Sequence, residues 1–545
     1  MTTTSSSSNF FNIGYACTTQ QLLNGHADKV ALKFIFPDQT SVDYTFLDLD
    51  TESNKIANFL STTLSIVEGE TVLILLPKTP ELFFSFLGSL KHKAITGILF
   101  SSLGESAISE RIIDSNATCI ITKKNFLKKI NFSKELYPNL KHILLIDIDE
   151  HIDATILSYK KLLAQASTMF IVPPTSPEAP SVLHYTSGST GKPKGVLHHH
   201  RSLALQKKTF REVLSVQEND IYWCTADQGW VTGVSYGIIG PWSNGTTQIQ
   251  YAGAYTPEVW FNILESEQVN VWYTAPTALR MLMKEDEALF TNYELHHLRH
   301  ISSVGEPLNP EIISWGKEVL GKDIYDTWFQ TETGAIMIAN RPGLPIKAGS
   351  MGKSSCNEIF PVIISDDGVP LPPKSEGNLC LVAPFSSLFS TYLHYPDIYQ
   401  KKFIHSYYFS GDRAYQDEDG YLWFLGRADD IINTAGHLVS PFEVESALLE
   451  HSAVSESAVI GVSDPLLYEK VVAFVSLKSG YQPSKEVELQ IRLHVSNRVS
   501  STATPQEVYF IDDIPKNNSG KIMRRILKKQ YINEDVGDTS TLMGS

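Results

Sequence analysis

The chain has 545 residues, 42% of them hydrophobic and 19% charged, and its formal net charge at pH 7 is -15. The acidic balance argues against a nucleic-acid binder, because phosphate contacts need a surplus of Lys and Arg. No apolar run is long and uninterrupted enough to predict a membrane span. None of the five cysteines stands in a CxxC pair, which argues against a zinc knuckle or a disulfide framework. We expect a cytoplasmic protein with reduced thiols and, at about 150 residues per domain, three or four folded units.

The first 25 residues are rich in Ser and Thr, and we expect them to form a disordered tail. They contain no Lys or Arg, so neither a secretory signal nor an Arg-rich transit peptide is indicated. From residue 26 onward, apolar runs at 70–76, 118–123 and 142–147 predict buried strands, and residues 79–94 predict a helix. Strands that alternate with helices indicate an α/β architecture with largely parallel sheets.

The C-terminal part of the sequence predicts a separate, smaller unit. Residues 409–430 predict a hairpin whose tip is the sequence DEDG, and a polar break follows it. Ser440, Pro441 and Glu443 have the spacing of the N-cap, N1 and N3 positions of a capping box, which predicts the start of a helix. Apolar runs at 458–462, 471–477 and 507–512 predict three strands interleaved with helices. Residues 429–545 are therefore predicted to form an α/β domain of about 115 residues.

The sequence HYTSGSTGKPKGV (residues 184–196) predicts a phosphate-binding loop. Glycines let successive backbone N–H groups converge on an anion, while hydroxyls add donors and lysines add positive charge. It is not a Walker A loop, because Pro193 follows Lys192 where that motif has Ser or Thr and starts a helix. On this stretch alone, a surface loop without a ligand is the alternative.

Five stretches, in family order, resemble the signature motifs of the adenylate-forming enzymes, which include acyl-CoA synthetases, luciferases and peptide-synthetase adenylation domains. They are YTSGSTGKPKG (185–195), YDTWFQTETG (325–334), SGD (410–412), GRADDIINTAGH (426–437) and PKNNSGKIMRR (515–525). Within that family, the stretches that resemble acetyl-CoA synthetases in particular are 223–241, 271–282, 303–311 and 537–542. The resemblance covers the chain from about residue 25 to its end.

This resemblance implies a fold and a reaction. A large N-terminal adenylation domain (26–428), with α/β subdomains and a β-barrel-like part, would be followed by a small mobile α/β domain (429–545). The implied activity is that of an AMP-forming acetate–CoA ligase. Acetate and ATP would give acetyl-adenylate and pyrophosphate, and CoA would then displace AMP. ATP and CoA would be substrates, and Mg²⁺ the cofactor.

The resemblance also implies a nucleotide site. The loop would hold the β- and γ-phosphates, Thr331 would contact phosphate, Glu332 would hold Mg²⁺ and Asp412 would accept hydrogen bonds from the ribose hydroxyls. One carboxylate is enough for Mg²⁺, because phosphate oxygens supply further ligands. The residues implied to bind ATP or AMP are Thr186, Ser187, Gly188, Ser189, Thr190, Gly191, Lys192, Lys194, Gly305, Glu306, Pro307, Asp326, Thr327, Trp328, Gln330, Asp412 and Arg427.

Lys521 is implied to be catalytic together with Thr331 and Glu332, because its charge can reach the oxygens that become more negative at the α-phosphate. A solvated lysine in a basic tail is the alternative. The family regulates this lysine by reversible acetylation, so an acetyltransferase and a deacetylase are implied partners. Asp429 would be the hinge about which the C-terminal domain rotates between the half-reactions, and Gly436 would line the CoA tunnel.

The acyl pocket is implied to consist of Trp230, Val231, Thr232, Val304 and Phe329. Acetyl-CoA synthetases typically carry Trp at the position of Phe329, and the smaller ring predicts a roomier pocket. An added methylene is worth about 0.8 kcal/mol of burial, and such pockets discriminate by only about 1–3 kcal/mol. Propionate or another short acid is therefore the alternative main substrate.

Two positions depart from the family pattern. Leu438 stands where the family has an Arg that approaches the phosphates, and the loss of such a charge-assisted hydrogen bond costs about 1.5–3 kcal/mol. Tyr468 stands where Gly normally precedes Glu469, and the sequence offers no physical reason for the glycine. A poorly active paralogue that binds ATP or acyl-AMP therefore remains a third hypothesis. The histidine run at 198–200 cannot hold one ion on a strand, and we expect it to be solvated or adjacent to the nucleotide.

Overall fold

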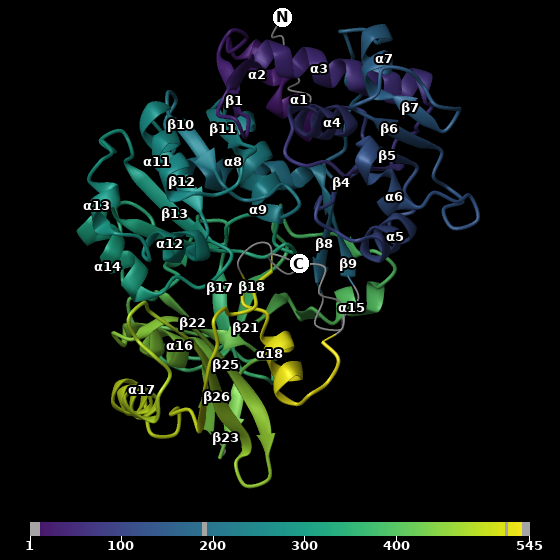
Figure 1. The fold of residues 1–545 in the computed structure, drawn as a ribbon. Helices are drawn as coiled ribbons and strands as arrows, with labels where there is room; N and C mark the ends of the chain where they lie inside the picture. Colours follow the sequence, from purple (N-terminus) through teal and green to yellow (C-terminus); the bar gives the residue numbers. More distant parts are fainter. Residues whose placement is uncertain (1–10, 188–192, 436, 518–520, 537–545) are drawn as a thin grey trace, which may run out of the picture.

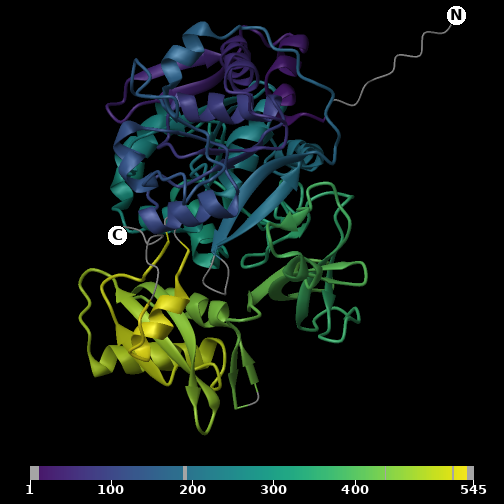
Figure 2. The same cartoon turned by 90° about the vertical axis from the view of Figure 1, so that its right-hand side faces the viewer.

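The structure is a computed structural model that describes residues 11–187, 193–435, 437–517 and 521–536. A large N-terminal lobe lies above a smaller C-terminal lobe in the view of Figure 1. The perpendicular view shows a small sheet beside the two lobes, drawn in green (Figure 2). None of the helices in the described ranges is long and apolar enough to cross a membrane.

The N-terminal tail is shorter than the sequence predicts. Helices α1 (Ile13–Cys17) and α2 (Thr19–Leu23) pack on the large lobe. The Asn12 side chain caps α1 by accepting a hydrogen bond from the Tyr15 N–H at 3.0 Å, and it donates to the Leu90 carbonyl at 2.8 Å. Ile13 and Cys17 are fully buried. The prediction of disorder is therefore wrong for residues 12–23, while residues 1–10 lie outside the described ranges.

The large lobe contains a nine-stranded sheet in the order β16-β15-β14-β13-β12-β10-β11-β1-β2. The strands from β14 to β1 are mutually parallel, and β2, β15 and β16 pair antiparallel at the two edges. The bounds are β1 (Val30–Ile35), β2 (Ser41–Thr45), β10 (Ile221–Cys224), β11 (Thr247–Tyr251), β12 (Val271–Thr274), β13 (His300–Val304), β14 (Ile324–Trp328), β15 (Ile338–Ala339) and β16 (Lys353–Ser354). Every residue of β12 and β13 is buried, which is typical of parallel strands covered on both faces.

A second sheet of eight strands has the order β19-β9-β8-β4-β3-β5-β6-β7. Its bounds are β3 (Thr71–Ile74), β4 (Ile95–Ile98), β5 (Cys119–Thr122), β6 (His142–Leu145), β7 (Ile156–Ser158), β8 (Pro180–Ser187), β9 (Pro193–His199) and β19 (Thr391–Tyr392). The three predicted strands are therefore present as β3, β5 and β6. The predicted helix is α4 (Pro80–Lys91), which is buried on nearly all sides and shares one core with side chains of β1 and β3.

Helices cover these two sheets, and several of them begin at a proline. Pro stands in the first turn of α4, α11, α12 and α14, where a missing N–H costs nothing. The remaining helices of the large lobe are α3 (Phe46–Asn58), α5 (Glu105–Asp114), α6 (Leu127–Ile130), α7 (Tyr159–Gln165), α8 (Leu203–Glu212), α9 (Val231–Val234), α10 (Gly240–Ser243), α11 (Pro257–Ser266), α12 (Pro276–Leu282), α13 (Glu287–Phe290), α14 (Pro310–Val319) and α15 (Pro396–Gln400).

A five-stranded antiparallel sheet stands where the family resemblance implies a β-barrel-like part. It comprises β17 (Pro361–Ile364), β18 (Gly377–Val382), β20 (Phe403–Ile404), β21 (Tyr407–Gln416) and β22 (Leu422–Arg427). The predicted hairpin is β21–β22. At its tip the Asp417 carboxylate accepts hydrogen bonds from the N–H groups of Asp419 and Tyr421 at 3.0 and 2.9 Å. The DEDG turn is therefore closed by its own first residue.

The C-terminal lobe is a five-stranded sheet with helices. Its elements are β23 (Ile432–Thr434), β24 (His437–Val439), α16 (Pro441–Glu450), β25 (Val454–Asp464), β26 (Tyr468–Leu477), α17 (Lys485–Arg498), β27 (Glu507–Phe510) and α18 (Arg524–Tyr531). Ser440 caps α16 as predicted, since its hydroxyl accepts from the Glu443 N–H at 3.1 Å. The prediction of helices between all three strands is wrong in one place, because β25 and β26 form a direct hairpin.

The backbone of Tyr468 explains the glycine that the family has at this position. Tyr468 is the first residue of β26, with φ of +71°, and 70% of its surface is exposed. A left-handed backbone costs residues other than Gly about 1–2 kcal/mol. Replacing the family's glycine with Tyr468 therefore introduces backbone strain.

Candidate active site

The family motifs meet at the carboxyl ends of the central parallel strands. Strands β13 and β14 pair in parallel, with Val304 opposite Thr327. The segments Gly305–Pro307 and Phe329–Glu332 therefore leave the sheet side by side. Ligands of open α/β sheets bind at this edge. The ends of these two adjacent strands thus bring together the predicted adenine residues, Val304 and Phe329 of the predicted acyl pocket, and the predicted phosphate and magnesium residues Thr331 and Glu332.

Asp412, on β21, is the most highly connected acid at this edge. It is 3% exposed. Its Oδ2 accepts hydrogen bonds from the Trp328 indole at 3.0 Å and the Gln330 amide at 3.2 Å, and its Oδ1 lies 2.9 Å from an Arg427 guanidinium nitrogen. Burial raises the pKa of Asp412, while the charges of Arg427 and Lys521 lower it. The acid is held in place from three elements.

The phosphate loop is the connection between two antiparallel strands. In the β8–β9 hairpin, Thr186 lies opposite Lys194, and Ser187 lies opposite Pro193. The Lys194 ammonium lies 5.8 Å from the centre of the Tyr392 ring. Residues Gly188, Ser189, Thr190, Gly191 and Lys192 lie outside the described ranges. The hairpin fixes both ends of the loop.

Glu332 is half-buried next to this hairpin. Its Oε1 accepts a hydrogen bond from the Tyr392 hydroxyl at 2.7 Å, and its carbonyl accepts one from the Phe389 N–H at 2.9 Å. The neighbouring Thr331 carbonyl is bonded to His198 Nε2 at 2.7 Å. Glu332 and the phosphate loop are thereby joined, since Tyr392 is on β19, which pairs with β9.

The donor chemistry of Glu332 fits Mg²⁺. Magnesium takes hard oxygen ligands and usually one or two carboxylates plus phosphate oxygens. Among the described residues, no group of three or more His, Cys, Asp or Glu side chains is placed to hold a metal. A single carboxylate beside the phosphate loop therefore suits an ion that arrives with the nucleotide.

Lys521 comes to this site from the C-terminal lobe. Its N–H donates to the Asn517 Oδ1 at 2.9 Å, and its carbonyl accepts from the Asn517 N–H at 2.9 Å. Lys521 is an exposed residue at the surface of this lobe, and its ammonium is partly desolvated by the surrounding protein. That desolvation lowers the pKa of Lys521, and the charge of Arg427 adds to the effect, whereas Asp412 and Asp430 oppose it. Lys521 thus lies within electrostatic reach of the Asp412–Arg427 pair.

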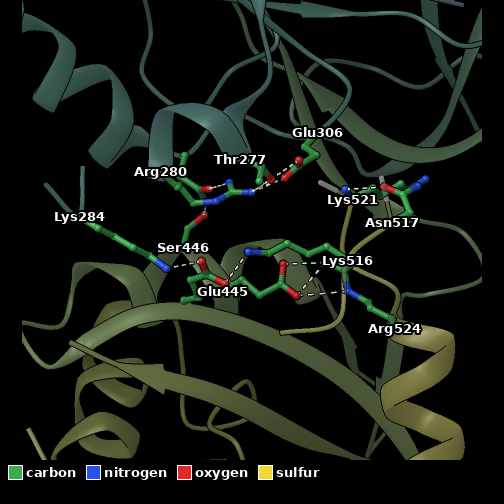
Figure 3. Close-up of polar contacts among 12 residues, drawn as sticks. Thr277, Arg280, Lys284, Glu306, Glu445, Ser446, Lys516, Asn517, Lys521 and Arg524 are labelled. Atoms are coloured by element: carbon green, nitrogen blue, oxygen red, sulfur yellow. Dashed lines mark hydrogen bonds and ion pairs between the residues drawn. The ribbon is translucent and has the colours of Figure 1, made fainter. Parts of the chain in front are cut away.

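The residues predicted around the adenine differ in how their side chains are used. Gly305 has φ of +97°, with nothing within 4 Å of the place of a Cβ. Glu306 is bound by Arg280 and Thr277, as Figure 3 shows. Burial raises the pKa of Asp326 well above its usual range. The Thr327 hydroxyl donates to the Ser303 carbonyl at 2.7 Å, and the residue is paired with Val304 on one side and Ala339 on the other, so Thr327 is held inside the sheet.

The predicted acyl residues form two groups joined by Tyr236. Val304 and Phe329 share a core cluster with Tyr236, whose ring centre lies 5.4 Å from that of Phe329. Tyr236 lies in a π-helical turn (Ser235–Ile239) that continues α9, the helix that carries the buried Val231 and Thr232. Trp230 stands at the N-cap position of this helix without a capping side-chain hydrogen bond, and its ring contacts that of Phe100, with ring centres 4.7 Å apart.

The predicted hinge lies between the lobes. Asp429 is exposed in the turn after β22, and its carboxylate lies 3.5 Å from the Arg427 guanidinium. Gly436, predicted in the CoA tunnel, lies outside the described ranges. Leu438 is 52% exposed on β24 and lines a small pocket with Glu376 and Glu443. In this arrangement Leu438 faces the small sheet.

Sequence reasoning missed several residues at the site. Burial lowers the pKa of Lys402, and the charges of Glu332 and Asp412 oppose that shift, so this lysine belongs to the charged cluster. The expectation of a solvated histidine run is wrong, because His198 is 3% and His200 0% exposed. His198 is instead adjacent to the phosphate motif through Thr331. These residues belong to no local sequence motif, and only strand pairing between distant parts of the chain places them at the site.

Two α/β lobes, with charged groups gathered at parallel strand ends, define a class of nucleotide-binding enzymes. Comparison with known families agrees. Residues 19–393 match the AMP-binding enzyme family, and residues 443–521 match the AMP-binding enzyme C-terminal domain. The chain belongs to the AMP-binding enzyme family.

Several similar proteins align with nearly the full length of the chain. An acetyl-coenzyme A synthetase of Bacillus subtilis is 42% identical over 97% of this chain and 92% of its own length. One of Pyrobaculum arsenaticum is 37% identical over 91% and 78%. Among solved structures, a Brucella canis acyl-CoA synthetase has 33% identity and a TM-score of 0.73, with 96% of this chain and 94% of that chain covered. An anthranilate CoA ligase in complex with anthranoyl-AMP has 29% identity and a TM-score of 0.86, with 96% and 98% covered.

Proposed function

We propose that this chain is an AMP-forming acetate–CoA ligase that converts acetate, ATP and CoA into acetyl-CoA, AMP and pyrophosphate. The observation that carries the proposal is the Asp412–Arg427 ion pair at 2.9 Å, which lies within electrostatic reach of Lys521 from the other lobe and whose arginine also interacts with Glu332. The acetyl-coenzyme A synthetases among the relatives support acetate as the acid.

In the first half-reaction, an acetate oxygen attacks the α-phosphorus, and the bond to the bridging oxygen of the β-phosphate breaks. Asp412 receives the ribose hydroxyls, because its buried carboxylate is already oriented by Trp328 and Gln330. Lys521 places its charge on the acetate and α-phosphate oxygens, where charge increases in the transition state. Glu332 would hold Mg²⁺, which supplies charge neutralisation for the triphosphate.

In the second half-reaction, the CoA sulfur attacks the acyl carbon and the acyl–phosphate C–O bond breaks, so that AMP leaves. One pose of the C-terminal lobe cannot both present Lys521 and admit CoA. We place the division between the domains at residues 428 and 429, with Asp429 as the hinge and Gly436 in the CoA tunnel.

Phe329 favours a second candidate substrate, propionate, because its ring is smaller than the Trp typical of acetyl-CoA synthetases. We also place the enzyme in the cytoplasm. Acetylation of Lys521 by an acetyltransferase, reversed by a deacetylase, would remove the charge that the first half-reaction needs.

The test is pyrophosphate–ATP exchange with acetate, propionate or butyrate in the absence of CoA. Exchange with acetate, and its loss in Lys521→Gln, is the expected result. A folded wild-type protein that binds ATP but exchanges with none of the acids would overturn the ligase assignment in favour of an ATP- or acyl-AMP-binding paralogue.

A further inference from the structure

The loop that carries Lys521 is fastened to the C-terminal lobe on both sides. Before it, the Lys516 ammonium lies 2.5 Å from Glu456 Oε2. After it, the Arg524 guanidinium makes two 2.7 Å hydrogen bonds to the Glu445 carboxylate. Glu445 and Glu456 are both buried. The position of Lys521 is therefore fixed within its own lobe, and its distance from Asp412 depends on how that lobe is seated.

One contact between the lobes involves Glu456, the same residue that binds Lys516. Lys284, just after α12 in the N-terminal lobe, places its ammonium 2.7 Å from Glu456 Oε1. Glu456 thus binds a lysine from each lobe, one on each carboxylate oxygen. Burial raises the pKa of Glu456, but the charges of Lys516 and Lys284 outweigh it, so the net pKa is lowered. Figure 3 shows Lys284 reaching from the upper lobe toward the acidic groups below it.

The helix that precedes Lys284 also touches the adenine side of the site. Arg280, on α12, binds Glu306 and donates to the Asn309 side chain at 3.3 Å. Asn309 in turn donates to the Ser446 hydroxyl of the C-terminal lobe at 2.9 Å. Two of the contacts between the lobes, Lys284–Glu456 and Asn309–Ser446, therefore both connect to α12.

We propose that Lys284 is a positioning residue for the adenylation half-reaction: its ion pair with Glu456 seats the C-terminal lobe so that Lys521 faces Asp412. This inference rests on the proposed function, because it assigns Lys284 to the step that uses Lys521. The proposal also predicts different effects on the two half-reactions. Loss of the pair slows the attack on the α-phosphate and spares the attack of CoA, which needs Lys521 withdrawn.

The first test is Lys284→Met, which keeps the length of the side chain and removes its charge. Pyrophosphate–ATP exchange with acetate should fall about five-fold or more, the range of ordinary coupling between sites. AMP release from supplied acetyl-adenylate and CoA should stay at or above the wild-type rate. Lys284→Arg should restore exchange, since the guanidinium can bind the same carboxylate. Lys317→Met is the matched control, because Lys317 pairs with Asp323 inside its own lobe at 3.0 Å.

The second test does not depend on activity. Hydrogen exchange of residues 276–284 and 454–457 should be faster in Lys284→Met than in Lys317→Met. Equal loss of both half-reactions, or an unchanged ratio between them, would refute the positioning role. If the wild type itself shows no exchange with any acid, the proposed function fails. The role of Lys284 in holding the C-terminal lobe is then tested by hydrogen exchange alone. Equal exchange of residues 276–284 and 454–457 in Lys284→Met and Lys317→Met would refute that role.

Discussion

Phe329→Trp tests which acid the pocket admits. The Phe329 ring packs against Tyr236 with ring centres 5.4 Å apart, and Val304 in the same cluster is 5% exposed, so this side of the ring is closed. We expect a larger ring to extend from its open side, where we place the acyl group. Propionate differs from acetate by one methylene, whose burial is worth about 0.8 kcal/mol. This corresponds to about four-fold in kcat/KM, and overpacking of about 1–3 kcal/mol adds to it if the indole reaches the methyl group.

The assay is the ratio of kcat/KM for propionate to that for acetate, in the wild type and in Phe329→Trp. We expect the ratio to fall at least about four-fold. Acetate is the internal control, since both acids share the nucleotide steps and any loss of folded enzyme cancels in the ratio. A ratio that stays constant or rises would show that Phe329 does not bound the pocket.

Three further substitutions test separate features. Leu438→Arg should raise the turnover of the complete reaction about ten-fold by returning a charge-assisted hydrogen bond, and unchanged or lower turnover would count against that role. Tyr468→Gly should raise the unfolding free energy by about 1 kcal/mol, because it relieves a left-handed backbone and removes little buried surface; a lower thermal midpoint would contradict the strain. Burial lowers the pKa of His300 from 6.5 to about 3, so the unfolded state alone gains a proton as the pH falls below 6.5. His300→Gln should therefore reduce the acid dependence of the unfolding free energy by about 1.4 kcal/mol per pH unit between pH 6 and 4; urea midpoints with the same slope as the wild type would contradict this.

The sequence predicted the parts of the fold whose signals are local. The cap at Ser440, the DEDG turn and the apolar runs of β3, β5 and β6 each depend on neighbouring residues, and all are present. The β25–β26 hairpin was missed although Asp464–Pro465 is a turn signal, and the Asp464 carboxylate closes the turn by accepting hydrogen bonds from the N–H groups of Leu466 and Leu467 at 2.9 Å. The first helices were missed because the Ser- and Thr-rich composition gives no sign of the hydrogen bond from the Asn12 side chain to the Leu90 carbonyl, 78 residues further along the chain.

The site shows the same division. The order of the motifs predicted that Asp412 and Lys521 act on one nucleotide, and the resemblance supplied that prediction. Tyr392 could not be predicted, since its bond to Glu332 depends on the pairing of β19 with β9, in which Tyr392 lies opposite Val196, 196 residues earlier in the chain. Lys402 has no motif either. A single sequence carries no signal for such contacts.

Because Glu456 is shared by two lysines, separation of the C-terminal lobe from Lys284 costs little free energy. A buried acid that loses its only cation is left uncompensated, which is strongly destabilising. Glu456 keeps Lys516 on its second oxygen when Lys284 leaves, and Lys284, 44% exposed, returns to water with little loss. In the domain movement that we propose, the lobe can therefore detach and return without leaving the Glu456 carboxylate unpaired. Because Glu456 has two lysine partners, this contact between the lobes can break and re-form while the carboxylate stays paired.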